Sequence, residues 1–157
     1  MDIDDFAARF ETCTLRKDEW THQAHLVVGL WHVDRFGAED ALVRLRDGIR
    51  RLNESFGGAN TATSGYHETI TAAYVTLLSQ FHDRRRDGES LADLVARLLD
   101  GPIAAKDMLL VFYSRERLMS TEARAAWVDP DRAPLHVAAI PSGLALAECR
   151  GGGHQAF

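Results

Sequence analysis

The amino-acid sequence predicts an all-α fold: a single, compact helical domain of about five to seven helices. Apolar residues recur at steps of three and four along most of the chain, which is typical of amphipathic helices. No pair of runs alternates apolar and polar residues as two strands of a half-buried sheet would. The length of 157 residues suits one domain, and no repeat or linker divides it. We expect the domain to span residues 1–157, with residues 148–157 as a flexible tail.

The first long helix is predicted over residues 22–36. Thr21 can cap it through its hydroxyl group, and Gly37 follows its last residue. A second helix is predicted over residues 38–56, where an apolar stripe is interleaved with charged residues until Gly57 and Gly58 end it.

Further helices are predicted in the second half of the chain. Residues 66–81 carry another apolar stripe, with Ser64 as the expected N-cap. Ser90 is expected to cap the helix that follows it. Residues 108–119 are assigned to a helix, because the run MLLVFYS finds no partner strand elsewhere in the chain. Ser120 is the expected cap of a short helix in TEARAAW.

Composition and charge exclude several classes of protein. Hydrophobic residues make up 46% and charged residues 26%, as in ordinary globular proteins. The net charge of −5 argues against a nucleic-acid partner, and the basic run 84–86 reads as a solvated helix end. No apolar run approaches the roughly 18 residues of a membrane span, so we expect no membrane partner. The acidic N-terminus is unlike a signal peptide, and the two cysteines have no metal-ligand spacing, which favours a cytoplasmic protein.

Three histidines at two predicted helix starts suggest a metal site. His22 and His25, in EWTHQAHL, are three residues apart and therefore share a helix face. His67, in SGYHET, lies at the start of the helix predicted over residues 66–81. Imidazole suits divalent transition metals, with zinc or iron favoured here and copper or nickel as alternatives. Glu68 follows His67 directly and is the candidate for proton transfer at metal-bound water.

Four further residues are predicted to bind a small-molecule ligand. His32 continues the histidine face of the first long helix, and it is also the main rival as a metal ligand. Asn60 and Tyr66 flank the GYHET element, while Tyr74 shares a face with His67. The small polar residues of GGANTATS lead into a helix, where free backbone N–H groups can hold a carboxylate or phosphate.

Two functions fit these patterns. The first is a metal-dependent hydrolase, lyase or oxygenase that acts on a small molecule. The second is a non-catalytic protein that binds a metal, a cofactor or a small ligand in the same pocket. In the simplest structural alternative, His22 caps a surface turn, His25 is a hydrogen-bonded core histidine, and His67 caps its helix.

The sequence also resembles a group of small, largely uncharacterised bacterial proteins that share a WTHxxHL element and a GYHET element. The matching segments here are EWTHQAHL with LWH, IRRLNES and NTATSGYHETIT, from about residue 20 to residue 71 and as far as YSRERLMSTEAR. The resemblance implies that the two elements form one unit. No established activity carries over with it.

Overall fold

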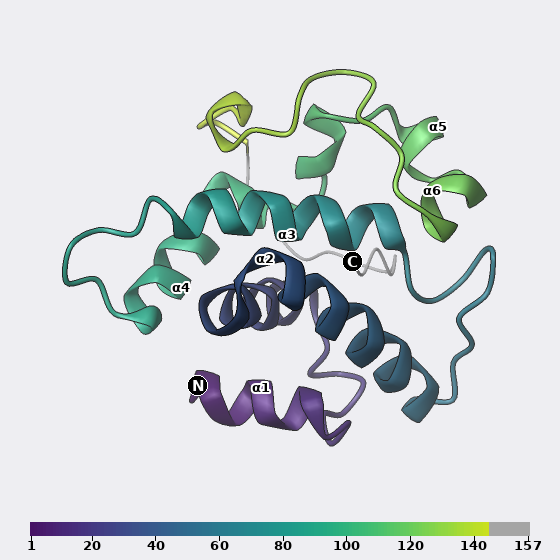
Figure 1. Ribbon diagram of the computed structural model, residues 1–157, viewed down its shortest axis with the longest axis horizontal. Helices are drawn as coiled ribbons and strands as arrows, with labels where there is room; N and C mark the ends of the chain where they lie inside the picture. The colour runs from purple at the N-terminus through teal and green to yellow at the C-terminus, as the bar shows by residue number, and fades with distance from the viewer. Residues whose placement is uncertain (145–157) are drawn as a thin grey trace.

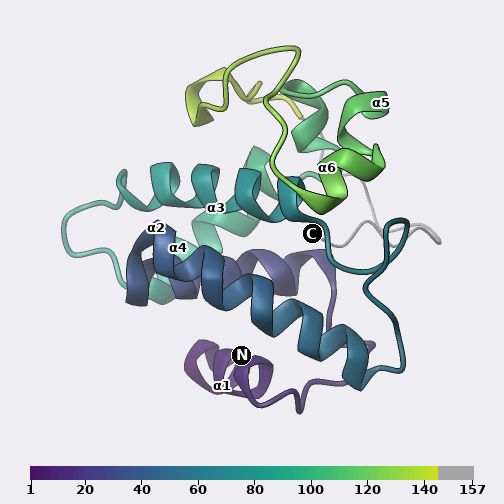
Figure 2. The same ribbon diagram turned by 45° about the vertical axis from the view of Figure 1, so that its right-hand side comes forward.

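The computed structural model describes residues 1–144, and it confirms the all-α prediction. Those residues form six α-helices and three short 3₁₀ helices, with no β-strand among them. Figures 1 and 2 show α2 between α1 and α3, with the chain that follows α4 covering the far side of α3. The predicted flexible tail, residues 148–157, lies outside the described residues.

Helix α1 (Ile3–Glu11) packs on α2 through a buried aromatic face. Asp2 caps α1 by accepting a hydrogen bond from the Asp5 backbone N–H at 3.1 Å. Phe10 is fully buried, and its ring lies directly against the backbone of Gly48 in α2. A Cβ atom on Gly48 would lie 2.5 Å from Cζ of Phe10, so the two helices can approach this closely only at a glycine.

Helix α2 (His22–Ser55) consists of two arms that meet at Gly37. Thr21 is the N-cap, as predicted, and its hydroxyl oxygen accepts a hydrogen bond from the Ala24 N–H at 3.2 Å. Gly37 has φ 74° and ψ 168°, which is not a helical conformation. The predicted break between residues 36 and 38 is therefore confirmed, and it turns the second arm away from the direction of the first.

Helix α3 (Glu68–His82) lies across α2, and most of its residues are buried. The predicted N-cap is wrong: the cap is His67, whose Nδ1 accepts a hydrogen bond from the Ile70 N–H at 3.2 Å. Ser64 is exposed in the preceding loop. Serine is the more common cap, but α3 begins three residues later than a cap at Ser64 requires, and the ring of His67 takes that role.

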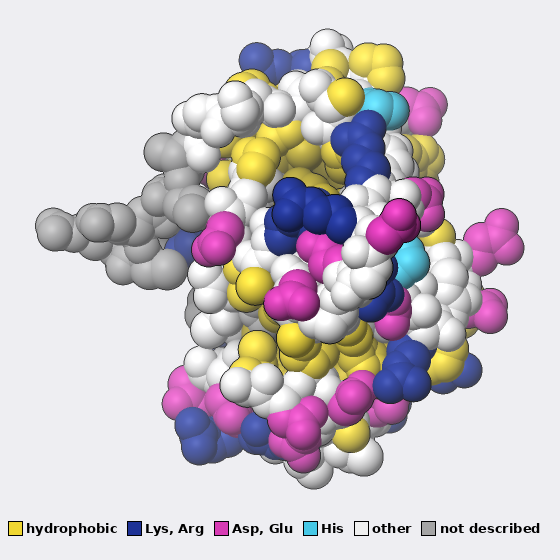
Figure 3. All heavy atoms as spheres, turned by 90° about the vertical axis from the view of Figure 1, so that its left-hand side faces the viewer, with side chains coloured by type: hydrophobic (Ala, Val, Ile, Leu, Met, Phe, Trp, Pro, Cys, Tyr) yellow, Lys and Arg dark blue, Asp and Glu magenta, His cyan; other side chains and the backbone are white. Residues whose placement is uncertain are grey.

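Helix α4 (Leu91–Leu99) begins after a charged connection that ion pairs hold in place. Ser90 caps α4 as predicted, by accepting from the Asp93 N–H at 3.1 Å. Figure 3 shows basic and acidic side chains interleaved on this face of the molecule. Arg85 lies 2.9 Å from Asp34 of α2, so the basic run is not simply a solvated helix end.

The chain after α4 folds in short pieces. The 3₁₀ helices Pro102–Ala104, Met108–Val111 and Val137–Ala139 alternate with α5 (Arg115–Leu118) and α6 (Thr121–Ala125). The single helix predicted over residues 108–119 is therefore wrong. Ser114 interrupts it, because its backbone N–H and hydroxyl group both donate to the Asp131 carboxylate, at 2.7 and 2.6 Å. The predicted cap of α6 by Ser120 is confirmed.

Across residues 1–144, no helix combines the length and the apolar character that a membrane crossing requires. Only α2, with 34 residues, is clearly long enough, and charged residues recur along its second arm.

Candidate functional site

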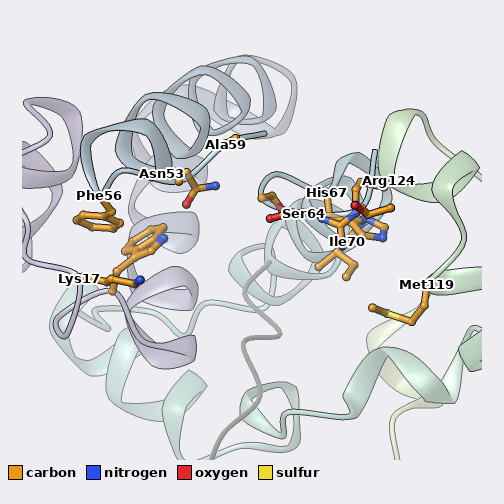
Figure 4. Close-up of a pocket in the computed structure, with 13 residues that line it drawn as sticks. Lys17, Asn53, Phe56, Ala59, Ser64, His67, Ile70, Met119 and Arg124 are labelled. Atoms are coloured by element: carbon orange, nitrogen blue, oxygen red, sulfur yellow. Dashed lines mark hydrogen bonds between the residues drawn. The ribbon is translucent and has the colours of Figure 1, made fainter. Parts of the chain in front are cut away.

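A pocket of about 340 Å³ opens where the C-terminal end of α2, the start of α3 and the segment around α6 meet. We call it the Arg124 pocket. Figure 4 shows its labelled side chains arranged around the opening, with Lys17 and Phe56 across from His67 and Arg124. The lining residues come from five separate parts of the chain: Lys17, Trp20, Asn53, Phe56, Gly58, Ala59, Thr63, Ser64, Gly65, His67, Ile70, Met119 and Arg124.

The charges around this pocket are all positive. Lys17 and Arg124 are its charged lining residues, and no carboxylate lines it. Arg124 donates through Nη1 to the backbone oxygens of Gly65 and Tyr66, at 2.7 and 3.3 Å. Neither cation forms an ion pair within residues 1–144. Burial lowers the pKa of Arg124. An anion in the pocket would therefore meet cations with no competing carboxylate.

The wall across from Arg124 is largely aromatic. Trp20 packs against Phe10 and His25, with ring centroids 5.2 and 3.7 Å away. Its indole N–H is buried and has no hydrogen-bond acceptor in the described part of the chain. Phe56 completes this wall beside Trp20. Lys17 lies on this aromatic side and Arg124 lies across the pocket, so a cation lines each side.

Asn60 shapes the pocket from behind the loop and does not line it. Its Oδ1 accepts from the Tyr66 backbone N–H at 3.0 Å and from Asn53 at 3.2 Å, while its Nδ2 donates to the Arg50 carbonyl oxygen at 3.1 Å. Gly65 packs so closely that a Cβ atom there would lie 2.7 Å from Oδ1 of Asn60. Its φ of +80° also favours glycine. Asn60 therefore anchors the loop, and its predicted role in ligand binding stays a prediction.

His67 lines the pocket, but both of its ring nitrogens have protein partners. Nδ1 accepts from the Ile70 N–H, and Nε2 donates to the Leu118 carbonyl oxygen at 2.8 Å. This pattern requires the neutral imidazole with its proton on Nε2. Burial lowers the pKa of His67 to about 4, despite the opposing effect of the Leu118 carbonyl. His67 therefore has no nitrogen free for a metal or a proton.

The other three predicted histidines have surroundings different from those of His67. His25 is 1% exposed, and its Nδ1 lies 2.6 Å from the Thr21 carbonyl oxygen. His22 lines a separate, smaller pocket, where its Nε2 is buried without a hydrogen-bond partner in residues 1–144. His32 is buried beside Phe10, with Nδ1 2.8 Å from the Val28 carbonyl oxygen.

The residues present do not fit the predicted metal centre. No group of three or more His, Cys, Asp or Glu side chains in residues 1–144 is placed to hold a metal ion. His67 would have to give up its helix cap or its bond to Leu118 in order to coordinate one. The three-histidine site with zinc, iron, copper or nickel stays a prediction, and no contact described here supports it.

Glu68 is held in an ion pair, and its surroundings do not favour the proton transfer predicted for it. Arg46 of α2 donates to its carboxylate, with Nε 2.9 Å from Oε2, and the Tyr66 hydroxyl group donates to Oε2 at 2.7 Å. Burial alone would raise the pKa of Glu68, but these two donors outweigh burial and leave that pKa below its usual value. A carboxylate with a lowered pKa and two fixed donors is a poor proton acceptor. Tyr66 is likewise part of this buried clamp, and it does not line the Arg124 pocket.

Tyr74 lies in the smaller pocket beside His22, with the two rings 5.9 Å apart and edge to face. Burial raises its pKa. The structure thus places Tyr74 beside His22, one of the predicted histidines, and its predicted role in ligand binding stays a prediction.

The two cations of the Arg124 pocket were not singled out from the sequence. Lys17 and Arg124 are more than a hundred positions apart, and although Arg124 ends the segment YSRERLMSTEAR, that segment gave no reason to assign it a role. The loop of small polar residues was the one usable signal, because it was expected to hold a carboxylate or phosphate. Comparisons with protein-family models, with curated proteins and with solved structures found no match to this chain.

Proposed function

We propose that this protein binds a small anionic molecule in the Arg124 pocket. The observation that carries the proposal is that two cations, Lys17 and Arg124, line the pocket from facing sides and that no carboxylate lines it. The volume of about 340 Å³ is within the range of small-molecule sites. A buried or half-buried cation without an acidic partner favours an anionic ligand, because the ligand supplies the missing charge.

The chemistry of the two walls defines the ligand class. A guanidinium group matches the two oxygens of a carboxylate or phosphate, and Arg124 retains N–H groups beyond those bound to the loop. Trp20 and Phe56 favour an apolar body attached to that anion. We therefore expect an organic carboxylate or phosphate ester with a small apolar part.

Binding without catalysis is favoured over the metal-dependent enzyme. Both nitrogens of His67 are occupied, and Glu68 is fixed by Arg46, so neither residue is available for proton transfer. The metal-dependent alternative requires the N-cap of α3 to be rebuilt around an ion. No observation here favours that rearrangement.

The first test uses three probes of nearly the same shape and different charge: benzoate, benzamide and benzamidine. We expect benzoate to bind most tightly to the protein in a titration followed by NMR, because only benzoate complements the two cations. Arg124→Gln should weaken benzoate binding by about tenfold, the loss expected for a charged hydrogen bond. Lys17→Gln should weaken it by about two- to fivefold, since Lys17 is exposed.

Arg132→Gln is the matched control, because Arg132 is exposed and does not line the pocket. It should leave benzoate binding unchanged. Arg124 also holds the loop at Gly65, so a loss of binding in Arg124→Gln alone could come from the loop; Lys17→Gln separates the two causes. Equal binding of the three probes, or full benzoate binding in both pocket variants, would refute the proposal.

A further inference from the structure

A second pocket shares a wall with the Arg124 pocket. It is small, about 20 Å³, and we call it the His22 pocket. Ile70 and Met119 line both pockets, one facing from α3 and the other from the turn after α5. The two hollows are therefore neighbours, separated by these two side chains.

The shared wall has one rigid side and one adaptable side. Ile70 is 8% exposed and is fixed in the first turn of α3. Met119 is 41% exposed, and its unbranched side chain can change rotamer without disturbing the core. Met119 is therefore the side chain that would have to move for the two pockets to join.

The His22 pocket has its own cation. Lys106 lines the His22 pocket, is exposed, and forms no ion pair in the described chain. Asp107 also lines this pocket and lies 3.9 Å from Arg115, so these two charges offset each other. His22 adds a buried Nε2 without a partner in residues 1–144. Leu109, Leu110 and Leu118 supply apolar lining between the charges.

We propose that the two pockets are the ends of one groove that takes an elongated molecule with an anionic group at each end and an apolar chain between them. One anionic group would bind at Lys17 and Arg124, the chain would pass Ile70 and Met119, and the second would bind at Lys106. This inference rests on the proposed function, because it extends the ligand of the Arg124 pocket.

The test compares linear dicarboxylates with a monocarboxylate. Adipate, suberate and sebacate increase in length, and octanoate has the carbon count of suberate with one carboxylate only. We expect one of the dicarboxylates to bind about three- to fivefold more tightly than octanoate, the gain expected for one more partly exposed ion pair. Lys106→Gln should remove this advantage and leave octanoate binding unchanged, whereas Lys106→Arg should keep it.

Methyl NMR of methionine gives a second, independent readout. The chain has three methionines, of which Met119 lines both pockets, whereas Met108 is fully buried and lines neither. A dicarboxylate should shift the Met119 methyl signal and the backbone signals of Lys106 and Ser64 together, while the Met108 methyl signal stays in place.

The outcomes separate the two proposals. Octanoate binding that depends on Lys17 and Arg124, without any dicarboxylate advantage, would overturn the two-ended groove and leave the Arg124 pocket standing. A dicarboxylate advantage that survives in Lys106→Gln would also overturn it. Binding of neither class, or binding that ignores Lys17 and Arg124, would overturn the proposed function itself.

Discussion

His67 illustrates how one residue can satisfy a sequence pattern for a reason other than the predicted one. It caps α3 through Nδ1 and donates to the Leu118 carbonyl oxygen through Nε2, and it is 1% exposed. A histidine near a helix start and an acidic neighbour predict a metal ligand with a base. The same two residues here connect α3 to the segment before α6 and to Arg46 of α2.

The protonation of His67 should make folding stability depend on pH. Its pKa is about 4 in the folded protein, against an ordinary value near 6.5. Because the folded pKa is the lower one, protons favour the unfolded chain, and this contribution is full above about pH 6.5 and is lost as pH falls toward 4. The loss is on the order of 2–3 kcal/mol.

His67→Asn tests this contribution, because asparagine can still cap α3 but cannot titrate. We expect the variant to be less stable at neutral pH, since it loses the bond to Leu118, and to lose less stability than the wild type between about pH 7 and pH 4.5. Urea unfolding at each pH measures both effects. The control is His136→Asn, which makes the same replacement of histidine by asparagine at an exposed histidine, the one that caps Val137–Ala139. An identical pH dependence in His67→Asn and wild type would contradict the expectation.

At the scale of the element, α2 shows which features of the fold can be predicted. Thr21, the glycine at position 37 and the apolar stripes are local signals; the predicted start and the predicted break were confirmed, and α2 ends at Ser55, one residue before the predicted end. The sequence favoured Ser64 as the cap of α3 and offered His67 only as an alternative, because the bond of His67 to Leu118 comes from a distant segment that local patterns do not indicate. The interruption at Ser114 depends likewise on Asp131, which the local sequence does not indicate.

Gly37 should therefore be required for the angle between the arms of α2. Its φ of 74° with ψ of 168° belongs to a region that is open to glycine and strained for other residues. No atom lies within 4 Å of a Cβ built there, so the cost of Gly37→Ala comes from the backbone alone. We expect a loss of about 1–3 kcal/mol in the free energy of unfolding.

The control for Gly37 is Glu39→Ala, an exposed change two residues away, which should stay within about 0.5 kcal/mol of the wild type. Urea unfolding of both variants measures the difference. A Gly37→Ala protein as stable as Glu39→Ala would show that the two arms can join as one straight helix at no cost.

At the scale of the whole molecule, the Arg124 pocket exists only because distant segments meet. Lys17 precedes α2, Asn53 lies in its last turn, and Arg124 lies in α6. Sequence patterns describe neighbours along a helix, so they pointed to histidines on α2 and at the start of α3. They could not indicate a lysine and an arginine that become neighbours of one cavity only after folding.

The metal prediction and the anion proposal differ in what zinc should do to the intact protein. Coordination by His67 would require a nitrogen that now serves Ile70 or Leu118, and each lost hydrogen bond costs about 0.5–1.5 kcal/mol. We therefore expect one equivalent of zinc to leave the melting temperature unchanged in protein that carries no histidine tag. A ligand that binds the native state tightly would raise it.

The same melting experiment with His136→Asn removes an exposed histidine that could bind zinc without relation to the site. A rise in melting temperature that persists in this variant and disappears in His25→Ala would establish the three-histidine centre. In that case Lys17→Gln should separate the metal site from the anion site. Zinc binding should be unchanged in this variant, because Lys17 is not a predicted metal ligand. Benzoate binding should fall, because Lys17 lines the Arg124 pocket.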